Sequence, residues 1–308
     1  MTKVALTIAG LDPSGGAGII ADIKTFTAFG CFATAAVASL TFQNTVGVFG
    51  AVNQTAESLR GQVEPILQDF TVSALKTGML PTREIIDEVA RLVRENNLEK
   101  FVVDPVVRST SGFDLIDDEA LQALIEKLFP LSTVVTPNIP EAERIARIKI
   151  ENINDIRRAA QIMQNFGARA VLIKGGHLPI ADRGTPNAEY KSQVEKSTNE
   201  DPNPKTGDQK TEQRTTNDER RKAVDFMFIG EQEFTFSADF IETTATHGTG
   251  CTFAAAITAN LANGKTLPEA VETAKRFVTE AIRTAPNLGR GHSPVNHSIA
   301  NFDLENAD

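Results

Sequence analysis

A chain of 308 residues with 41% hydrophobic side chains can bury a sizeable core, as one large α/β domain or two ordinary ones. The formal net charge of −9 argues against a nucleic-acid partner, because phosphate backbones usually require a basic face. The two cysteines, Cys31 and Cys251, lie far apart, which argues against a disulfide scaffold and favours a reducing compartment. With no apolar run near the length of a membrane span, we expect a cytoplasmic protein that acts on a small molecule and has no membrane partner.

The first half of the chain alternates short β-branched runs with helical patterns, which is typical of βαβ units around a largely parallel sheet. We expect strands at 4–9, 32–39, 48–52, 72–76, 101–104, 133–136 and 170–174. Helices are expected at 17–29, 56–70, 83–96, 117–129, 141–147 and 153–166, with Thr82 and Asn154 as N-caps. The pattern therefore predicts an α/β fold.

Residues 181–223 interrupt this alternation, because Tyr190 and Val194 are their only bulky apolar side chains. Such a segment buries too little surface to offset its ordering entropy, so we predict a polar, disordered insertion within a single domain that spans residues 1–308. A regulatory or partner-binding element is the alternative. Beyond it we expect a β-hairpin at 224–229 and 233–236, and helices at 248–263 and 267–285.

The glycine-dense stretch from Gly10 to Gly18 follows the first strand and opens a helix, where backbone can approach an anionic ligand closely. It is not a Walker A loop, because Gly16 stands where that motif requires lysine. A dinucleotide fingerprint is disfavoured because no acidic residue ends the second strand. A tight turn without a ligand is the alternative.

The stretch from Thr246 to Thr252 precedes an apolar helix, and its glycines allow several amides to converge on one anion. Cys251 lies in the same turn, where a helix N-terminus lowers the pKa of a thiol and favours a role as base. The alternative is that Cys251 is a small buried helix residue and the glycines form a loop.

Other candidates for chemistry follow strands. Asp104 ends one strand, while Asn138 and Glu141 begin a helix and offer oxygen ligands suited to magnesium or its waters. Lys174 ends another strand and could meet a phosphate there. Each residue has an ordinary alternative, a helix cap for the acids and asparagine and a solvated strand end for the lysine. The histidines and cysteines show no zinc-site spacing.

Taken together, these stretches resemble the hydroxymethylpyrimidine/phosphomethylpyrimidine kinases of thiamine biosynthesis, within the ribokinase-like superfamily. The resemblance rests on Thr7 to Gly18, Gln43 to Thr45, Lys76 to Leu80, Val103 to Val106, Pro137 to Glu143, Lys174 to His177, His247 to Thr252 and the tail from Gly291 to His297. It implies a three-layer α/β/α sandwich with a mainly parallel central sheet, ATP and Mg²⁺ as cofactors, and a homodimer.

The resemblance also implies roles for the candidate residues. Gln43 would hydrogen-bond the ring nitrogen and amino group of the pyrimidine, and Asp104 and Glu141 would organise magnesium and water. Lys174 would neutralise the transferring phosphate, and Cys251 would be the catalytic base at a position where most of the superfamily has aspartate. The remaining assignments are Gly10, Met79 and Val106 as the pocket lining, Asp22 near the substrate, and Gly248, Thr249 and Gly250 as the anion hole. Asn138 would bind the cofactor together with Lys174, Thr249 and Gly250.

The implied activity is ATP-dependent phosphorylation of 4-amino-5-hydroxymethyl-2-methylpyrimidine and then of its monophosphate. A pyridoxal kinase of the same superfamily is the nearest alternative, although Gln43 and Met79 favour the aminopyrimidine. A non-catalytic pyrimidine-binding regulatory protein is a second alternative, and the presence of Asp104, Glu141, Lys174 and Cys251 argues against it.

Overall fold

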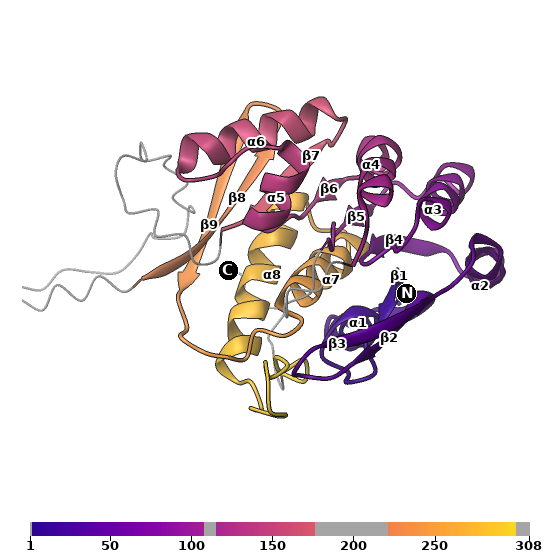
Figure 1. Ribbon diagram of the computed structural model, residues 1–308, viewed down its shortest axis with the longest axis horizontal. Coiled ribbons are helices and arrows are strands. Elements are labelled where there is room, and N and C mark those ends of the chain that lie inside the picture. Colours follow the sequence, from indigo (N-terminus) through magenta and orange to yellow (C-terminus); the bar gives the residue numbers. More distant parts are fainter. Residues whose placement is uncertain (1, 108–114, 176–220, 300–308) are drawn as a thin grey trace, which may run out of the picture.

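The computed structural model describes residues 2–107, 115–175 and 221–299, and its central layer is one twisted sheet (Figure 1). Within these residues the strand order is β3-β2-β1-β4-β5-β6-β7-β8-β9. The strands are β1 (Val4–Leu11), β2 (Phe32–Gln43), β3 (Val48–Asn53), β4 (Val72–Thr77), β5 (Phe101–Val103), β6 (Val134–Val135), β7 (Ala170–Lys174), β8 (Lys222–Ile229) and β9 (Gln232–Asp239). Across the sheet, the neighbouring strands β2, β1, β4, β5, β6 and β7 are parallel to one another. At the two sides of the sheet, β3 pairs antiparallel with β2, β8 with β7, and β9 with β8.

Helices cover both faces of this sheet. They are α1 (Gly18–Ala28), α2 (Ala56–Asp69), α3 (Arg83–Glu95), α4 (Asp118–Lys127), α5 (Ile139–Ala146), α6 (Ile153–Asn165), α7 (Thr249–Ala262) and α8 (Leu267–Arg283), with a short 3₁₀ turn η1 (Phe129–Leu131). One apolar core lies between the sheet and α2 to α6, and a second lies between the sheet and α1, α7 and α8. The expected three-layer α/β/α sandwich with a mainly parallel sheet is therefore confirmed.

The inner parallel strands are mostly apolar because both of their faces are covered. In β1, for example, every residue from Ala5 to Gly10 is buried. Helix α7 is apolar all round for the same reason, since it packs between the sheet, α1 and α8. All its residues from Thr252 onward are buried.

Two sequence-based boundaries were wrong in an informative way. Strand β2 was expected to end at Ser39 but continues to Gln43, because β3 folds back and pairs with it through Gln43 and Val48. The N-cap of α6 is Asn152 rather than Asn154, since the Asn152 side chain accepts from the backbone N–H of Asp155 in a capping box. The expected cap at Thr82 is confirmed, because its side chain accepts from the N–H of Ile85.

The predicted insertion at 181–223 lies outside the described residues except at its end, where Lys222 and Ala223 already belong to β8. The hairpin expected after it is confirmed as β8 and β9. No helix in the described ranges is both long and apolar enough to cross a lipid bilayer.

Candidate active site

A cavity of about 520 Å³ opens at the carboxyl ends of the parallel strands. Open parallel sheets place their ligands at this edge, because the loops that follow the strands gather there. Residues at or just after the carboxyl ends of six strands line it together with the start of α7, namely Gly10, Gln43, Met79, Asp104, Val106, Asn138, Glu141, Lys174, Gly248, Thr249, Gly250 and Cys251. The structure thus brings together every predicted site residue except Asp22.

The first turn of α7 forms the candidate anion hole. Its N-cap, Gly248, has φ +80, and a Cβ there would lie 1.8 Å from the carbonyl oxygen of Gly16, so only glycine fits. The N–H of Thr249 donates to the carbonyl of Thr246 at 3.3 Å and is already satisfied. Because the first amides of a helix have no partner within it, those of Gly250 and Cys251 are the better donors to a phosphate.

Cys251 stands where the N-terminal ends of α1 and α7 meet, since the backbone N–H of Gly18 faces its sulfur. The expected lowering of its pKa is nevertheless wrong. Burial raises the pKa of the thiol to about 11, with further increases from the charges of Asp22 and Asp104, and the ammonium of Lys76 only partly offsets them. Without bound substrates, Cys251 is therefore a thiol at neutral pH.

Lys174 lies beside this turn, because a Cβ on Gly250 would be 3.3 Å from its Nζ. Its Nζ donates to Asp104 Oδ1 at 2.9 Å, and the Thr136 hydroxyl donates to the same oxygen at 2.9 Å. Burial alone would raise the pKa of Asp104, but the ammonium groups of Lys174 and Lys76 hold it below its usual value. Asp104 is thus an anion that keeps Lys174 charged at the cavity wall.

Glu141 and Asn138 form a capping box at the start of α5, in which each side chain accepts from the backbone N–H of the other residue. Burial and the charge of Asp104 raise the pKa of Glu141 to about 7. A cation next to these carboxylates would relieve that repulsion and favour the ionised form.

No group of three or more His, Cys, Asp and Glu side chains in the described part of the chain is arranged to cage a metal ion alone. Magnesium usually keeps several waters and is shared between one or two carboxylates and substrate phosphates. Asp104 and Glu141 fit that mode of binding, because both line the cavity and interact electrostatically.

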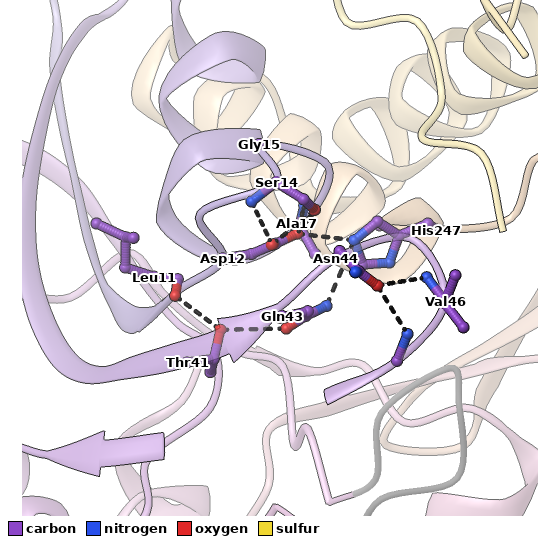
Figure 2. Close-up of polar contacts among 12 residues, drawn as sticks. Leu11, Asp12, Ser14, Gly15, Ala17, Thr41, Gln43, Asn44, Val46 and His247 are labelled. Atoms are coloured by element: carbon purple, nitrogen blue, oxygen red, sulfur yellow. Dashed lines mark hydrogen bonds and ion pairs between the residues drawn. The ribbon is translucent and has the colours of Figure 1, made fainter. Parts of the chain in front are cut away.

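On the substrate side, Gly10 and Met79 are in close contact, since a Cβ on Gly10 would lie 3.1 Å from the Met79 sulfur. Gln43, at the end of β2, contacts His247 and Thr41 (Figure 2). Asp22 does not line the cavity. It is fully buried behind the wall, where its carboxylate pairs with Lys76, so direct contact with a substrate is not supported.

Two polar contacts that border the cavity, a hydrogen-bonded pair and an ion pair, were missed from the sequence. The Asp12 carboxylate lies 2.7 Å from His247 Nε2, and Lys275 Nζ lies 2.6 Å from Asp225 Oδ2. Asp225 also accepts from the N–H of Gly175 at 3.1 Å, which ties β8 to the end of β7. The sequence does point to Asp225, because a carboxylate that interrupts the apolar run of β8 requires a buried partner.

His297, in the tail after α8, packs against the first turns of α7. Its Nε2 lies 3.0 Å from Thr252 Oγ1, and because that hydroxyl donates to the Gly248 carbonyl, it accepts from the imidazole. Burial lowers the pKa of His297 to about 4, and the charges of Lys24 and His247 add to this.

This environment predicts a pH-dependent stability. Between pH 6.5, near the ordinary histidine pKa, and about 4, the unfolded chain binds a proton at His297 that the folded chain does not. Above this window the neutral His297 makes its full contribution to stability. As the pH falls through the window, roughly 3 kcal/mol of the free energy of unfolding is lost. Urea unfolding of wild type and His297→Gln at pH 7 and 4.5 measures it, and equal losses in both proteins would contradict the assignment.

Comparison with known proteins identifies the family. The family model described as phosphomethylpyrimidine kinase matches residues 12–207 and 204–296. A hydroxymethylpyrimidine/phosphomethylpyrimidine kinase of Bacillus subtilis (strain 168) is 38% identical over 293 residues, which cover 95% of this chain and 94% of that protein.

Two solved structures show the same fold. A phosphomethylpyrimidine kinase from Clostridium difficile 630 has a TM-score of 0.70 and 35% sequence identity, and the match covers 91% of this chain and 100% of that chain. An ADP complex of Bacillus subtilis pyridoxal kinase has a TM-score of 0.76 and 33% identity, with 97% and 98% of the two chains covered. The fold, the cavity at the carboxyl edge of the sheet and these matches together show that the chain belongs to the phosphomethylpyrimidine kinase family.

Proposed function

We propose that this kinase uses ATP to phosphorylate the hydroxymethyl group of 4-amino-5-hydroxymethyl-2-methylpyrimidine, and then phosphorylates the monophosphate to the diphosphate for thiamine biosynthesis. The observation that carries the proposal is a single cavity in which an amide side chain, Gln43, shares the wall with a helix N-terminus and a buried lysine, Lys174. An amide can pair with adjacent amino and ring-nitrogen groups, and the opposite wall can receive phosphates.

Phosphoryl transfer requires positioning and charge neutralisation more than covalent chemistry. The backbone N–H groups at the start of α7 donate to the oxygens of the transferring phosphate, and Lys174 neutralises its developing charge while Asp104 holds the ammonium in place. The thiolate form of Cys251 takes the proton from the substrate hydroxyl and becomes a thiol. Asp104 and Glu141 would hold magnesium, which supplies further neutralisation of the phosphate oxygens when bound.

The second phosphorylation makes a different demand on the same cavity. A phosphate oxygen of the monophosphate is already ionised near neutral pH and needs no base. Cys251 is therefore needed only for the first reaction, whereas Lys174 and the α7 amides serve both.

Pyridoxal is the second candidate substrate, because a solved structure with high similarity is a pyridoxal kinase. Pyridoxal has no amino group, so the Gln43 amide would lose one of its partners and the aminopyrimidine is favoured. A binding protein without turnover is disfavoured, since Lys174, Asp104 and Cys251 all line the cavity.

A coupled ATP-turnover assay on purified protein tests the function, with hydroxymethylpyrimidine, its monophosphate and pyridoxal measured in parallel. Turnover of both pyrimidines supports the proposal. A higher kcat/KM for pyridoxal would move the activity to vitamin B6 salvage, and no turnover of any of them would favour a binding role.

We also propose that two copies associate through the β2–β3 hairpin. Phe42, Val46, Phe49 and Val52 are 55%, 57%, 69% and 50% exposed on this hairpin, whose strand β3 ends the sheet within the described residues. Clustered apolar side chains of this kind mark an interface.

Analytical ultracentrifugation of three proteins tests the dimer. We expect wild type to sediment as a dimer and Phe49→Glu as a monomer. Phe166→Glu is the matched control, because Phe166 is 40% exposed at the end of α6, and this variant should remain dimeric. A monomeric wild type would refute the proposal.

A further inference from the structure

A continuous chain of polar contacts runs along the cavity wall from Asp12 through His247 and Gln43 to Thr41 (Figure 2). His247 Nε2 lies 2.7 Å from Asp12 Oδ2 and 3.4 Å from the side-chain nitrogen of Gln43. The other end of the Gln43 amide lies 3.2 Å from Thr41 Oγ1. Asp12 and His247 are both buried, at 3% and 6% exposure, so their contacts are protected from solvent.

The chemistry of Asp12 fixes the position of a proton on His247. The Asp12 carboxylate accepts from the N–H groups of Ser14 and Ala17 and from the Ser14 hydroxyl. Although burial alone would raise its pKa, the hydrogen bonds from His247 and Ser14 lower it, so Asp12 is ionised. An ionised carboxylate can only accept, and a nitrogen 2.7 Å from it must carry hydrogen. His247 Nε2 is therefore a donor.

This proton determines the orientation of the Gln43 amide. The one hydrogen on His247 Nε2 is donated to Asp12 at 2.7 Å, so this nitrogen cannot accept from an amide N–H. The carbonyl oxygen of Gln43, which can share that hydrogen at 3.4 Å, is therefore the end of the amide that fits there. The amide is rotated by half a turn from the orientation drawn in Figure 2. Its nitrogen then faces Thr41, whose hydroxyl donates to the Leu11 carbonyl at 2.9 Å and has a lone pair to accept from Gln43. In this orientation no N–H of Gln43 faces the N–H of His247, and the Thr41 hydroxyl donates to Leu11 while it accepts from Gln43.

We propose that His247, held by Asp12, is a positioning residue that fixes which end of the Gln43 amide faces each side of the substrate pocket. This inference rests on the proposed function and explains its specificity. With the oxygen near His247 and the nitrogen near Thr41, the amide keeps one lone pair and one N–H for a ligand. That combination matches an amino group next to a ring nitrogen, in one orientation of the ring only.

His247 also links the pyrimidine side of the cavity to the anion hole at the start of α7. It immediately precedes Gly248, and its backbone N–H donates to the carbonyl of Ser293 at 3.2 Å, which anchors the loop in front of α7. A Cβ on Gly16 would lie 2.4 Å from the His247 ring, so the glycine-rich loop after β1 packs directly on the imidazole. The residue that orients Gln43 is thus fixed in the same unit as the anion hole.

Steady-state kinetics with hydroxymethylpyrimidine test the role. We expect His247→Leu to raise KM for the pyrimidine roughly tenfold, which corresponds to the loss of about one hydrogen bond to the substrate. KM for ATP should change less than about twofold. His247→Gln, which keeps a donor near Nε2, should recover most of the loss. His292→Leu is the matched control, because His292 is an exposed histidine that contacts Thr246 rather than Gln43, and its KM values should match wild type.

A double-mutant cycle separates positioning from a general structural effect. In a Gln43→Leu background, His247→Leu should raise KM less than about twofold further, because the group it orients is gone. A full tenfold rise in both backgrounds would overturn the proposal. If His247→Leu does not fold, Thr41→Val removes the partner at the other end of the amide and should raise KM for the pyrimidine in the same Gln43-dependent way.

Nitrogen NMR of the substrate-free protein tests the inference independently of activity. We expect a proton on His247 Nε2 and nuclear Overhauser contacts from the Gln43 amide protons to the Thr41 methyl group. An unprotonated Nε2 with the amide protons close to the His247 ring would overturn the proposal. A wild-type protein that does not turn over hydroxymethylpyrimidine would refute the proposed function alone, and the NMR result would still decide the orientation of Gln43.

Discussion

Replacement of Cys251 by alanine is expected to lower kcat for hydroxymethylpyrimidine by roughly 10²–10⁴-fold, the usual contribution of a general base. Phosphorylation of the monophosphate should change by less than about tenfold, because its nucleophile is already an anion. Both substrates occupy the same cavity, so each serves as the control for the other. Rapid-quench or coupled assays with the two substrates on one preparation measure the ratio.

The pH dependence sharpens this test. Because burial raises the pKa of Cys251 to about 11, the fraction of thiolate in the free enzyme increases with pH throughout the neutral and mildly alkaline range. We therefore expect log kcat/KM for the alcohol to rise with a slope near one from about pH 7 to 9. The monophosphate should show no such rise, since its second ionisation is complete above about pH 7.

Cys251→Asp is the matched variant, because a carboxylate retains a base at this position with a much lower ordinary pKa. It should keep activity toward the alcohol and flatten the pH profile. Equal losses on both substrates in Cys251→Ala would instead assign the residue to shaping the anion hole.

The sequence predicted the fold well because its periodicities are strong and local. Apolar strands covered on both faces differ clearly from amphipathic helices such as α3, and the parallel order then places Asp104 and Lys174 at one edge. The end of β2 could not be predicted in the same way. It depends on pairing with β3, which no local pattern shows.

The electrostatics of the site were harder to predict than its location. A helix N-terminus lowers the pKa of a thiol, but the desolvation of Cys251 is the larger effect, and its extent depends on residues from several elements. The Asp12–His247 contact joins positions 235 residues apart, so only the folded chain shows it. Lys76 did leave a signal, since a lysine in the apolar strand β4 requires a buried partner.

That buried partner is Asp22, and the pair makes the second large prediction. Lys76 is fully buried, and its Nζ lies 2.8 and 2.9 Å from the two carboxylate oxygens of Asp22. The Thr7 hydroxyl also donates to Asp22 at 2.7 Å, so the pair joins α1, β1 and β4 behind the cavity wall. Burial alone would lower the pKa of Lys76, but the carboxylates of Asp22 and Asp104 raise it, so the ammonium persists.

Lys76→Met leaves the Asp22 carboxylate buried without its counter-charge, and the free energy of unfolding should fall by about 3–5 kcal/mol. The double variant Lys76→Met/Asp22→Leu removes both charges and should recover most of that loss, because an apolar pair of similar volume needs no desolvation of ions. Urea unfolding of the three proteins at pH 7 measures the difference. Equal destabilisation of the single and double variants would show that packing, rather than an unpaired charge, sets the cost.

The double variant also separates stability from catalysis. The ammonium of Lys76 lowers the pKa of Cys251 more than the carboxylate of Asp22 raises it, so removal of both charges should leave the thiol harder to ionise. The refolded double variant is therefore expected to phosphorylate the alcohol more slowly than wild type at any pH below the thiol pKa, and the monophosphate at the wild-type rate. A matching loss on both substrates would mean that the pair supports the shape of the cavity, and that the charge of Lys76 has no separate effect on the base.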